Sequence, residues 1–462
     1  MFFGLIPPKS TQKNNISSFL ACKSALFFAL QQQLDTTKII LQSTHKTLIN
    51  KTNNIKPHVI TITRECIFLN HHYIKNNIAL QITNKATIMN PSSEHIAAKI
   101  MNGPQISLDN PASLNNLPDG EFQAILLEGV SRTFALTIPQ LPDALYPAVA
   151  NAYLLCRIVD TIEDEVSLDV KQKKYFCMAF IDIVKTGNNA KAFAEELAPL
   201  LSEQTIPAEH SLIHLTPRVI EITRSFDQAQ IDALAYCVET MAKGMPVFQA
   251  LDLHAGLETM TDMDDYCYYV AGCVGEMLAK LFCHYSAEIN LHNDELLKLS
   301  VSFGQGLQMT NILKDIWDDA QRGVCWLPQD IFTETGFDLK NLTPETDDEN
   351  FRKGLEHLIS IAHEHLNNAL KYTQLLPANE TGIRNFCLWA LGMSVLTLKN
   401  IKNNLDFNDS NQVKITRKDV KRTVLVCKLT ARSNTLLSLL FNLTSRSLNT
   451  PDWQYAPQTV KE

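Results

Sequence analysis

The chain has 462 residues, of which 45% are apolar and 19% are charged. This composition excludes a disordered, collagenous or low-complexity protein, because so much apolar surface buries a core. The formal net charge of −8 argues against binding nucleic-acid phosphates through bulk positive charge, so we expect no nucleic-acid partner. No apolar run reaches the roughly 18 residues that a bilayer-spanning helix needs, and no such helix is predicted.

The eleven cysteines are scattered through apolar stretches, and no two of them form a Cys-x-x-Cys pair. This pattern is typical of buried free thiols in a reducing compartment. We therefore expect a cytoplasmic protein.

The first hundred residues differ from the rest. They carry ten lysines, one arginine, one aspartate and two glutamates, a net charge of +8, which leaves −16 for the remainder. Lys23 interrupts the only apolar stretch that resembles a signal-peptide core. We predict that residues 1–110 are an extension without a fixed fold, or sequence upstream of a true start at Met89 or Met101. A targeting arm and a small separate domain are the alternatives.

From about residue 117, apolar residues recur with the 3.6-residue period of amphipathic helices. The period predicts helices over residues 143–164, 175–201, 231–250, 264–286, 294–319, 351–376, 383–401 and 417–442. Prolines that we expect to separate helices are Pro207, Pro217, Pro246, Pro328, Pro344 and Pro377. Neither alternating β-type runs nor a fixed-period repeat is present. The sequence predicts one all-α domain over residues 111–445, with a tail over 446–462.

Two acidic clusters lie within predicted helices, at residues 160–164 (DTIED) and 315–319 (DIWDD). Residues three and four apart share one face of a helix. The first polar stripe therefore contains Tyr153, Arg157, Asp160 and Asp164, with Glu163 at its edge. The second contains Gln308, Asn311, Asp315 and Asp318 or Asp319. The opposite faces are apolar, so both helices are expected to pack into the body of the domain.

Like charges at these spacings destabilise a helix by roughly 0.2–0.5 kcal/mol per pair. The arrangement is explained if cations lie between the carboxylates. Mg²⁺ prefers oxygen ligands and is typically held by one or two carboxylates together with substrate phosphates. The two stripes thus predict a site that holds a diphosphate through Mg²⁺. The alternative is a pair of solvated acidic faces.

Three sequence blocks resemble the signatures of the squalene/phytoene synthases. The first block comprises residues 131–135 (SRTFA) and 153–164 (YLLCRIVDTIED), and the others are residues 266–275 (YCYYVAGCVG) and 308–319 (QMTNILKDIWDD). The similarity spans roughly residues 120–442 and keeps the order of the family's blocks. Residues 1–100 have no counterpart in this resemblance.

The resemblance implies the all-α isoprenoid (terpenoid) synthase fold with a central cavity, and head-to-head condensation of two prenyl diphosphates. By similarity, Mg²⁺–diphosphate would be bound by Asp160, Glu163, Asp164, Asn311, Asp315 and Asp319. The diphosphates would also contact Arg132, Tyr153, Arg157, Gln308 and Lys314. Tyr266 would lie near the reacting carbons, where its ring stabilises an allylic cation and its hydroxyl moves a proton. Gly272 and Gly275 would allow close approach of a ligand or a neighbouring helix.

Within the family, the first signature is most similar to squalene-type members, which form squalene from farnesyl diphosphate and consume NADPH. The nicotinamide cofactor would contact Phe386, Lys414 and Arg417, in segments that resemble the squalene-type reductive region. Lys314 stands where many relatives have arginine, and Thr416 replaces a basic residue. The alternatives are a phytoene or dehydrosqualene synthase that performs no reduction, and a non-catalytic assembly or binding protein of the same fold.

The apolar substrate and product lead us to expect peripheral membrane contact. A monomer is expected. The loop around residues 321–329 is a candidate flap over the cavity.

Overall fold

The computed structural model describes residues 111–131 and 133–448, and all of these belong to one compact unit. The described part is helical, and its only β-type pairing is an isolated bridge between Leu257 and Pro328. The all-α prediction is confirmed. The predicted extension over residues 1–110, and all but the first residues of the predicted tail, lie outside the described residues.

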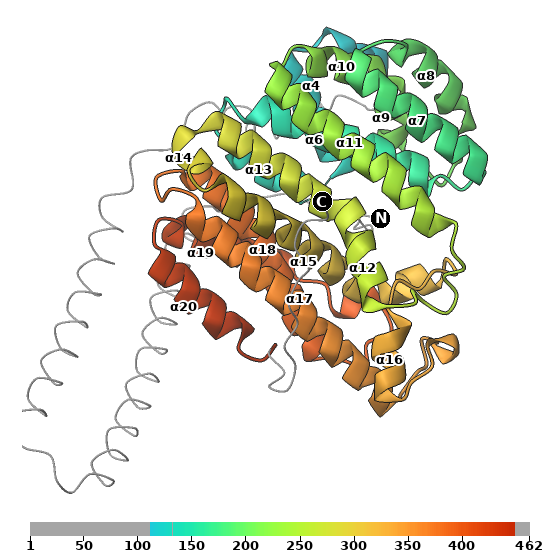
Figure 1. The fold of residues 1–462 in the computed structure, drawn as a ribbon, viewed down its shortest axis with the longest axis vertical. Coiled ribbons are helices and arrows are strands. Elements are labelled where there is room, and N and C mark those ends of the chain that lie inside the picture. The colour runs from blue at the N-terminus through green and yellow to red at the C-terminus, as the bar shows by residue number, and fades with distance from the viewer. Residues whose placement is uncertain (1–110, 132, 449–462) are drawn as a thin grey trace, which may run out of the picture. The chain divides into compact units, whose positions relative to one another are not determined.

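The amino-terminal half of the described chain forms one group of helices (Figure 1). Its elements are η1 (Pro111–Asn116), α4 (Asp119–Val130), α5 (Phe134–Thr137), η2 (Ile138–Gln140), α6 (Tyr146–Asp164), α7 (Val170–Thr186), α8 (Ala190–Leu197), η3 (Ala198–Leu200), α9 (Pro207–His214), α10 (Thr216–Arg224) and α11 (Gln228–Gln249). Within this group, α11 packs along α7 and α6.

The second half contains the longest helix, α15, which packs against α13 on one side and α17 on the other. Its elements are α12 (Met260–Cys267), η4 (Tyr268–Gly272), α13 (Cys273–Tyr285), α14 (Ala287–Asn290), α15 (Asn293–Ala320), α16 (Gln329–Thr335), η5 (Leu339–Asn341), α17 (Glu349–Leu375), α18 (Thr381–Lys402), η6 (Ser410–Gln412), α19 (Arg417–Thr430) and α20 (Asn434–Ser445). Because α13 also contacts α11, the two groups share one core.

The predicted helical faces are confirmed at the two acidic helices. The side of α6 opposite the acids is buried at Leu155, Val159 and Ile162, and the matching side of α15 is buried at Met309, Ile312 and Ile316. The nine cysteines in the described residues are all buried and free, as expected. No helix among these residues is both long and apolar enough to cross a membrane.

Three predicted helices are interrupted in the structure. The segment 175–201 breaks at Gly187, whose φ of 81° ends α7 in the left-handed conformation that glycine adopts readily. The segment 264–286 contains the π-helical turn η4, and 417–442 breaks where the Ser433 side chain caps α20. The prediction that Pro246 separates helices is wrong, because Pro246 lies inside α11, near its carboxyl end.

Two glycines allow α13 and α15 to approach each other closely. A Cβ on Gly275 would lie 2.1 Å from the Ser300 carbonyl oxygen, and one on Gly304 would lie 2.1 Å from the Ala271 carbonyl oxygen. No real Cβ tolerates such a contact with backbone, so either substitution forces the helices apart. The close approach expected at Gly275 is therefore between helices.

We predict that Gly304→Ala lowers the free energy of unfolding by about 3 kcal/mol or more, because the helix pair must separate. Urea denaturation followed by circular dichroism measures the change. Gly120→Ala is the matched control, since a Cβ there meets nothing within 4 Å. In helix α4 it should be neutral or stabilise by about 0.5–1 kcal/mol. Equal effects of the two substitutions would contradict this account of the packing.

Candidate active site

Both acidic clusters lie at the carboxyl ends of their helices. Residues 160–164 form the last turn of α6, and residues 315–319 form the last turn of α15. A helix carries partial negative charge at its carboxyl end, so acidic side chains there are destabilising. These carboxylates repel one another, and the helix dipole also opposes negative charge at this end of each helix. Cationic partners must therefore compensate them.

Arg157 compensates the first cluster from a buried position. Its Nη1 lies 3.9 Å from Asp160 Oδ2 and 3.4 Å from Glu209 Oε1, while its Nη2 donates to the Tyr153 hydroxyl at 3.1 Å. Although burial alone would lower the pKa of Arg157, these partners raise it above its usual value. Arg157 therefore stays charged, and it joins α6 to α9 through Glu209.

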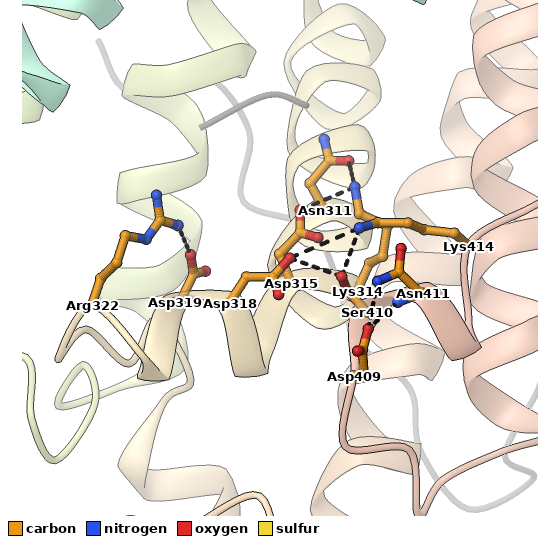
Figure 2. Close-up of polar contacts among 10 residues, drawn as sticks. All are labelled: Asn311, Lys314, Asp315, Asp318, Asp319, Arg322, Asp409, Ser410, Asn411 and Lys414. Carbon is orange, nitrogen blue, oxygen red and sulfur yellow. Dashed lines mark hydrogen bonds and ion pairs between the residues drawn. The ribbon is translucent and has the colours of Figure 1, made fainter. Parts of the chain in front are cut away.

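Lys314 and Arg322 compensate the second cluster (Figure 2). Lys314 Nζ lies 3.0 Å from Asp315 Oδ2 and donates to Asn311 Oδ1 at 3.2 Å. Arg322, in the turn after α15, donates to Asp319. The cluster thus contains an internal lysine and receives a guanidinium from the following loop.

Asp318 takes no part in the contacts of Asp315 and Asp319. Figure 2 shows it facing the loop before α19, where Ser410 Oγ donates to Asp318 Oδ2 at 2.8 Å. Lys414 Nζ donates to the same serine at 2.7 Å and lies 3.9 Å from the carboxylate. Asp318 therefore ties this loop to α15, and Asp319 is the member of the pair that belongs to the site.

Tyr266 on α12 links the two clusters electrostatically. It is buried, and its pKa is raised well above the usual value by burial and by the negative charges of Glu163, Asp164 and Asp319. These acids come from α6 and from α15, so both clusters lie close to this one phenol. The meeting of the two acidic stripes across one cavity stays a prediction.

A cavity of about 500 Å³ opens beside Tyr266. Its lining includes Glu163 and Asp164 of the first cluster, Lys173 of α7, and Trp326 from the loop after α15. The volume lies within the ~300–1,000 Å³ usual for ligand sites. Apolar side chains such as Leu168 and Leu253 complete the walls, so carboxylates and apolar surface share one chamber.

Asp160, Glu163 and Asp319 have raised pKa values, whereas the pKa of Asp164 is lowered although burial opposes that shift. Burial and the nearby charge of Asp164 raise the pKa of Glu163 to about 8. Burial raises that of Asp319 to about 7 although Arg322 opposes the shift, and Asp315 adds to it. Grouped carboxylates with raised pKa values are characteristic of functional sites, where a bound cation restores the charged form.

The donor set fits Mg²⁺ bound together with a diphosphate. Within residues 111–131 and 133–448, no three His, Cys, Asp or Glu side chains converge on one metal position. Mg²⁺ rarely needs such a cage, because it retains waters and takes one or two carboxylates plus phosphate oxygens. The residues able to supply oxygen are Asp160, Glu163, Asp164, Asn311, Asp315 and Asp319.

Several buried polar atoms of the site lack a hydrogen-bond partner in the described part of the chain. They are Arg157 Nε, Gln308 Oε1 and Trp326 Nε1. A buried polar atom without a partner costs about 1–3 kcal/mol. Of the three side chains, Trp326 lines the cavity, so its N–H is available there to a polar ligand.

A buried polar network fixes α12, which carries Tyr266. His365 on α17 has Nε2 3.6 Å from Asp264 Oδ1, and its Nδ1 shares a hydrogen bond of 2.9 Å with Ser302 Oγ on α15. Gln305 Nε2 also donates to the Asp264 carbonyl oxygen at 3.1 Å. The network thereby joins α12, α15 and α17 at Asp264, which precedes Tyr266 by two residues in the chain.

The other residues predicted for the site are Arg132, Lys414, Arg417 and Phe386. Arg132 lies outside the described residues. Lys414 contacts the second cluster through Ser410, whereas Arg417 is exposed at the start of α19. Phe386 lies in the core, where its ring packs edge-on against Phe282 with centroids 6.2 Å apart.

Thr416 has a local structural role. Its side chain accepts a hydrogen bond from the backbone N–H of Asp419, and the Asp419 carboxylate accepts one from the Thr416 backbone N–H, which forms a capping box on α19. A basic residue at position 416 could not form this cap.

Sequence reasoning missed three residues of the site, namely Glu209, Arg322 and Trp326. Arg322 was detectable, because it follows Asp319 by three residues and the helical period brings such pairs together. Glu209 and Trp326 reach the site through tertiary packing alone, and no local pattern indicates either of them.

The chain is similar to proteins of one known family. The squalene/phytoene synthase family profile matches residues 127–419. Squalene synthase of Solanum lycopersicum is 30% identical over 293 residues, which cover 63% of this chain and 66% of that protein. Squalene synthase 3 of Panax ginseng is 30% identical over 324 residues, 69% of this chain and 71% of the relative. The chain thus spans about two thirds of the length of these curated relatives.

Solved structures show the same fold. A structure of TcSQS with a bound ligand superposes with a TM-score of 0.56 at 24% identity, covering 71% of this chain and 98% of the other. A second ligand complex of TcSQS gives a TM-score of 0.53 at the same identity and coverage. The predicted isoprenoid synthase fold is confirmed.

We predict that His365→Ala lowers the free energy of unfolding by about 3 kcal/mol, because it removes the histidine beside the buried Asp264 carboxylate. His363→Leu is the matched control. His363 is also buried on α17, yet neither of its ring nitrogens has a hydrogen-bond partner among the described residues. This control should be neutral or stabilising in the same urea titration. The account fails if His363→Leu costs as much as His365→Ala.

Proposed function

Because the chain belongs to the squalene/phytoene synthase family, which carries out head-to-head prenyl condensation, we propose that it is a squalene-type synthase. In this proposal it joins two molecules of farnesyl diphosphate to presqualene diphosphate and then reduces this intermediate to squalene with NADPH. The squalene synthase names of the relatives at about 30% identity support the squalene type.

The observation that carries the proposal is the position of the two acidic clusters around Tyr266. Carboxylates from α6 and α15 influence one buried phenol, which lines a cavity with both polar and apolar walls. The acidic part of such a place suits a diphosphate held with Mg²⁺, and the apolar part suits a prenyl chain. Solvated acidic faces would need neither the cavity nor the buried cations.

The chain's own residues bind and orient the leaving group in the first step. Arg157 is held by Tyr153 and Glu209, so its unpartnered Nε is preoriented to donate to a diphosphate oxygen. Gln308 and Lys314 would complete the binding of the diphosphates. Mg²⁺, when bound, would neutralise the charge that develops on the departing diphosphate. Breaking the C1–O bond then yields an allylic cation.

The cavity directs the cation to carbon–carbon bond formation. The double bond of the second farnesyl diphosphate attacks the cation, a proton is lost, and a cyclopropyl diphosphate results. Tyr266 keeps its phenolic proton near neutral pH, because burial and the surrounding acids raise its pKa. It can therefore donate a hydrogen bond within the site. Water must be excluded at this stage, since it would trap the cation.

The second step would use the region around Lys414. Departure of the second diphosphate and rearrangement give a cation that accepts hydride from NADPH. Lys414 and Arg417 supply cationic groups that suit the cofactor's phosphates. The contacts of Lys414 with Ser410 and Asp318 support this proposal, since they fix its ammonium beside α15. Phe386 packs in the core against Phe282, and its contact with the cofactor stays a prediction.

Two further properties are proposed with the function. The buried free thiols support a reducing, cytoplasmic location. An apolar substrate and product favour peripheral contact with a membrane. A phytoene or dehydrosqualene synthase, which would not need the reductive region, is the alternative within the family.

We predict that Asp160→Asn and Asp315→Asn each reduce Mg²⁺-dependent release of diphosphate from farnesyl diphosphate by at least about 100-fold, because each removes a carboxylate from the site. Asp318→Asn is the matched control on the same helix turn as Asp315, and we expect it to change the rate by less than about threefold. Full activity of both Asp160→Asn and Asp315→Asn would overturn the site assignment. A purified wild-type chain that releases no diphosphate would favour a binding role.

We predict that extraction of the product with and without NADPH distinguishes the subtypes. Farnesyl diphosphate with NADPH should give squalene, and without NADPH presqualene diphosphate should accumulate. Lys414→Gln should raise the KM for NADPH about tenfold while formation of presqualene diphosphate is unchanged, because it removes one charge–phosphate contact. Phytoene from geranylgeranyl diphosphate, or a hydrocarbon formed equally well without NADPH, would support the alternative subtype.

A further inference from the structure

The loop after α15 places an aromatic ring directly on Tyr266. The rings of Trp326 and Tyr266 are stacked, with centroids 3.7 Å apart and planes 8° apart. Both side chains are buried, with 5% and 4% of their surfaces exposed, and both line the cavity. The two rings therefore form a face-to-face stack in the wall of the chamber, in which each ring covers one face of the other.

Backbone hydrogen bonds hold the loop that carries Trp326, and with it the stacked pair of rings, in place. Cys325 N donates to the Leu253 carbonyl oxygen at 2.9 Å, and Leu257 N donates to the Leu327 carbonyl oxygen at 2.9 Å. These bonds flank Trp326 on both sides and tie its loop to the segment that leads into α12. Gly256 permits the approach through its φ of 92°, because a Cβ there would lie 2.4 Å from the Leu327 carbonyl oxygen. Trp326 is thus preorganised before any ligand enters.

The neighbours of Tyr266 limit what its own ring can do. Trp326 covers one face of the phenol, and Phe248 packs against it edge-on with centroids 5.5 Å apart. The ring faces of Tyr266 are therefore largely occupied by protein. Trp326 provides the larger ring of the pair, and indole is the side chain that attracts cations most strongly through its π-face.

A second observation at the same residue points to a ligand. Trp326 Nε1 is buried and has no hydrogen-bond partner in the described residues. Trp389 Nε1 also lacks a partner among the described residues, but Trp389 does not line the cavity, whereas Trp326 does. Since Trp326 lines the chamber, its N–H is available to a polar atom of the bound molecule.

We infer that Trp326 is a further catalytic residue, whose indole face stabilises the allylic cation and whose N–H contacts the bound diphosphate, while Tyr266 acts through its hydroxyl. This inference rests on the proposed function, since it concerns the cation which that reaction forms. It assigns a role to the loop after α15 in the chemistry itself, in addition to any part in closing the cavity.

The test separates binding of a cation from turnover. The probe is a farnesyl ammonium ion, added with inorganic diphosphate and Mg²⁺, and compared with the uncharged farnesyl alcohol. The full-length wild-type chain, Trp326→Phe and Trp326→Leu are titrated with each by calorimetry. Trp389→Leu is the matched control, because Trp389 is also buried and its Nε1 also lacks a partner among the described residues, but it lies on α18 and faces Lys428 of α19.

We predict that the wild-type chain and Trp389→Leu prefer the ammonium to the alcohol by the same factor, whereas Trp326→Leu reduces that preference about tenfold. Trp326→Phe should lie between them, since phenylalanine retains a π-face but lacks the N–H. The kcat for diphosphate release should fall about twentyfold in Trp326→Leu, with the KM for farnesyl diphosphate within about threefold of wild type.

An unchanged ammonium preference in Trp326→Leu would overturn the inference, even if activity falls, because only packing would then have been lost. An equal loss of the preference for the ammonium in Trp389→Leu would overturn the inference as well. Failure of the proposed function has a different signature, since the wild-type chain would then release no diphosphate from farnesyl diphosphate.

Discussion

The repulsion between carboxylates at the ends of two helices is the constraint on which the rest of the site depends. Asp160–Asp164 and Asp315–Asp319 are grouped where the helix dipoles already oppose negative charge. Arg157, Lys314 and Arg322 compensate them only in part, and Glu163 and Asp319 keep raised pKa values. The protein therefore tolerates an electrostatic cost that, in the function proposed here, a divalent cation and a diphosphate would together remove.

The surrounding fold supplies a rigid frame for these charges. Close backbone contact at Gly275 and Gly304 joins α13 to α15, and the network of Asp264, His365 and Ser302 joins α12 to α15 and α17. Tyr266 is fixed two residues beyond this network. Because these links lie outside the cavity, they fix Tyr266 without taking up the space for a ligand.

The sequence predicted the features that depend on local periodicity and chemical composition. The helical period identified the buried faces of α6 and α15, and the spacing of the acids identified the two clusters. It did not predict the break at Gly187, the π-helical turn η4, or that Pro246 lies within α11. Glu209 on α9 and Trp326 in the loop after α15 could not be predicted, because both reach the site through tertiary packing that no local pattern encodes. Arg132 and residues 1–110 lie outside the described chain.

The central claim is that the acids of α6 and α15 form a single cation site with diphosphate. Binding of Mn²⁺, followed by electron paramagnetic resonance with and without inorganic diphosphate, tests it most directly. The account predicts weak binding of Mn²⁺ alone, at least tenfold tighter binding with diphosphate, and loss of that gain when a carboxylate is neutralised on either helix. Tight Mn²⁺ binding that ignores diphosphate, or that depends on one helix only, would contradict it.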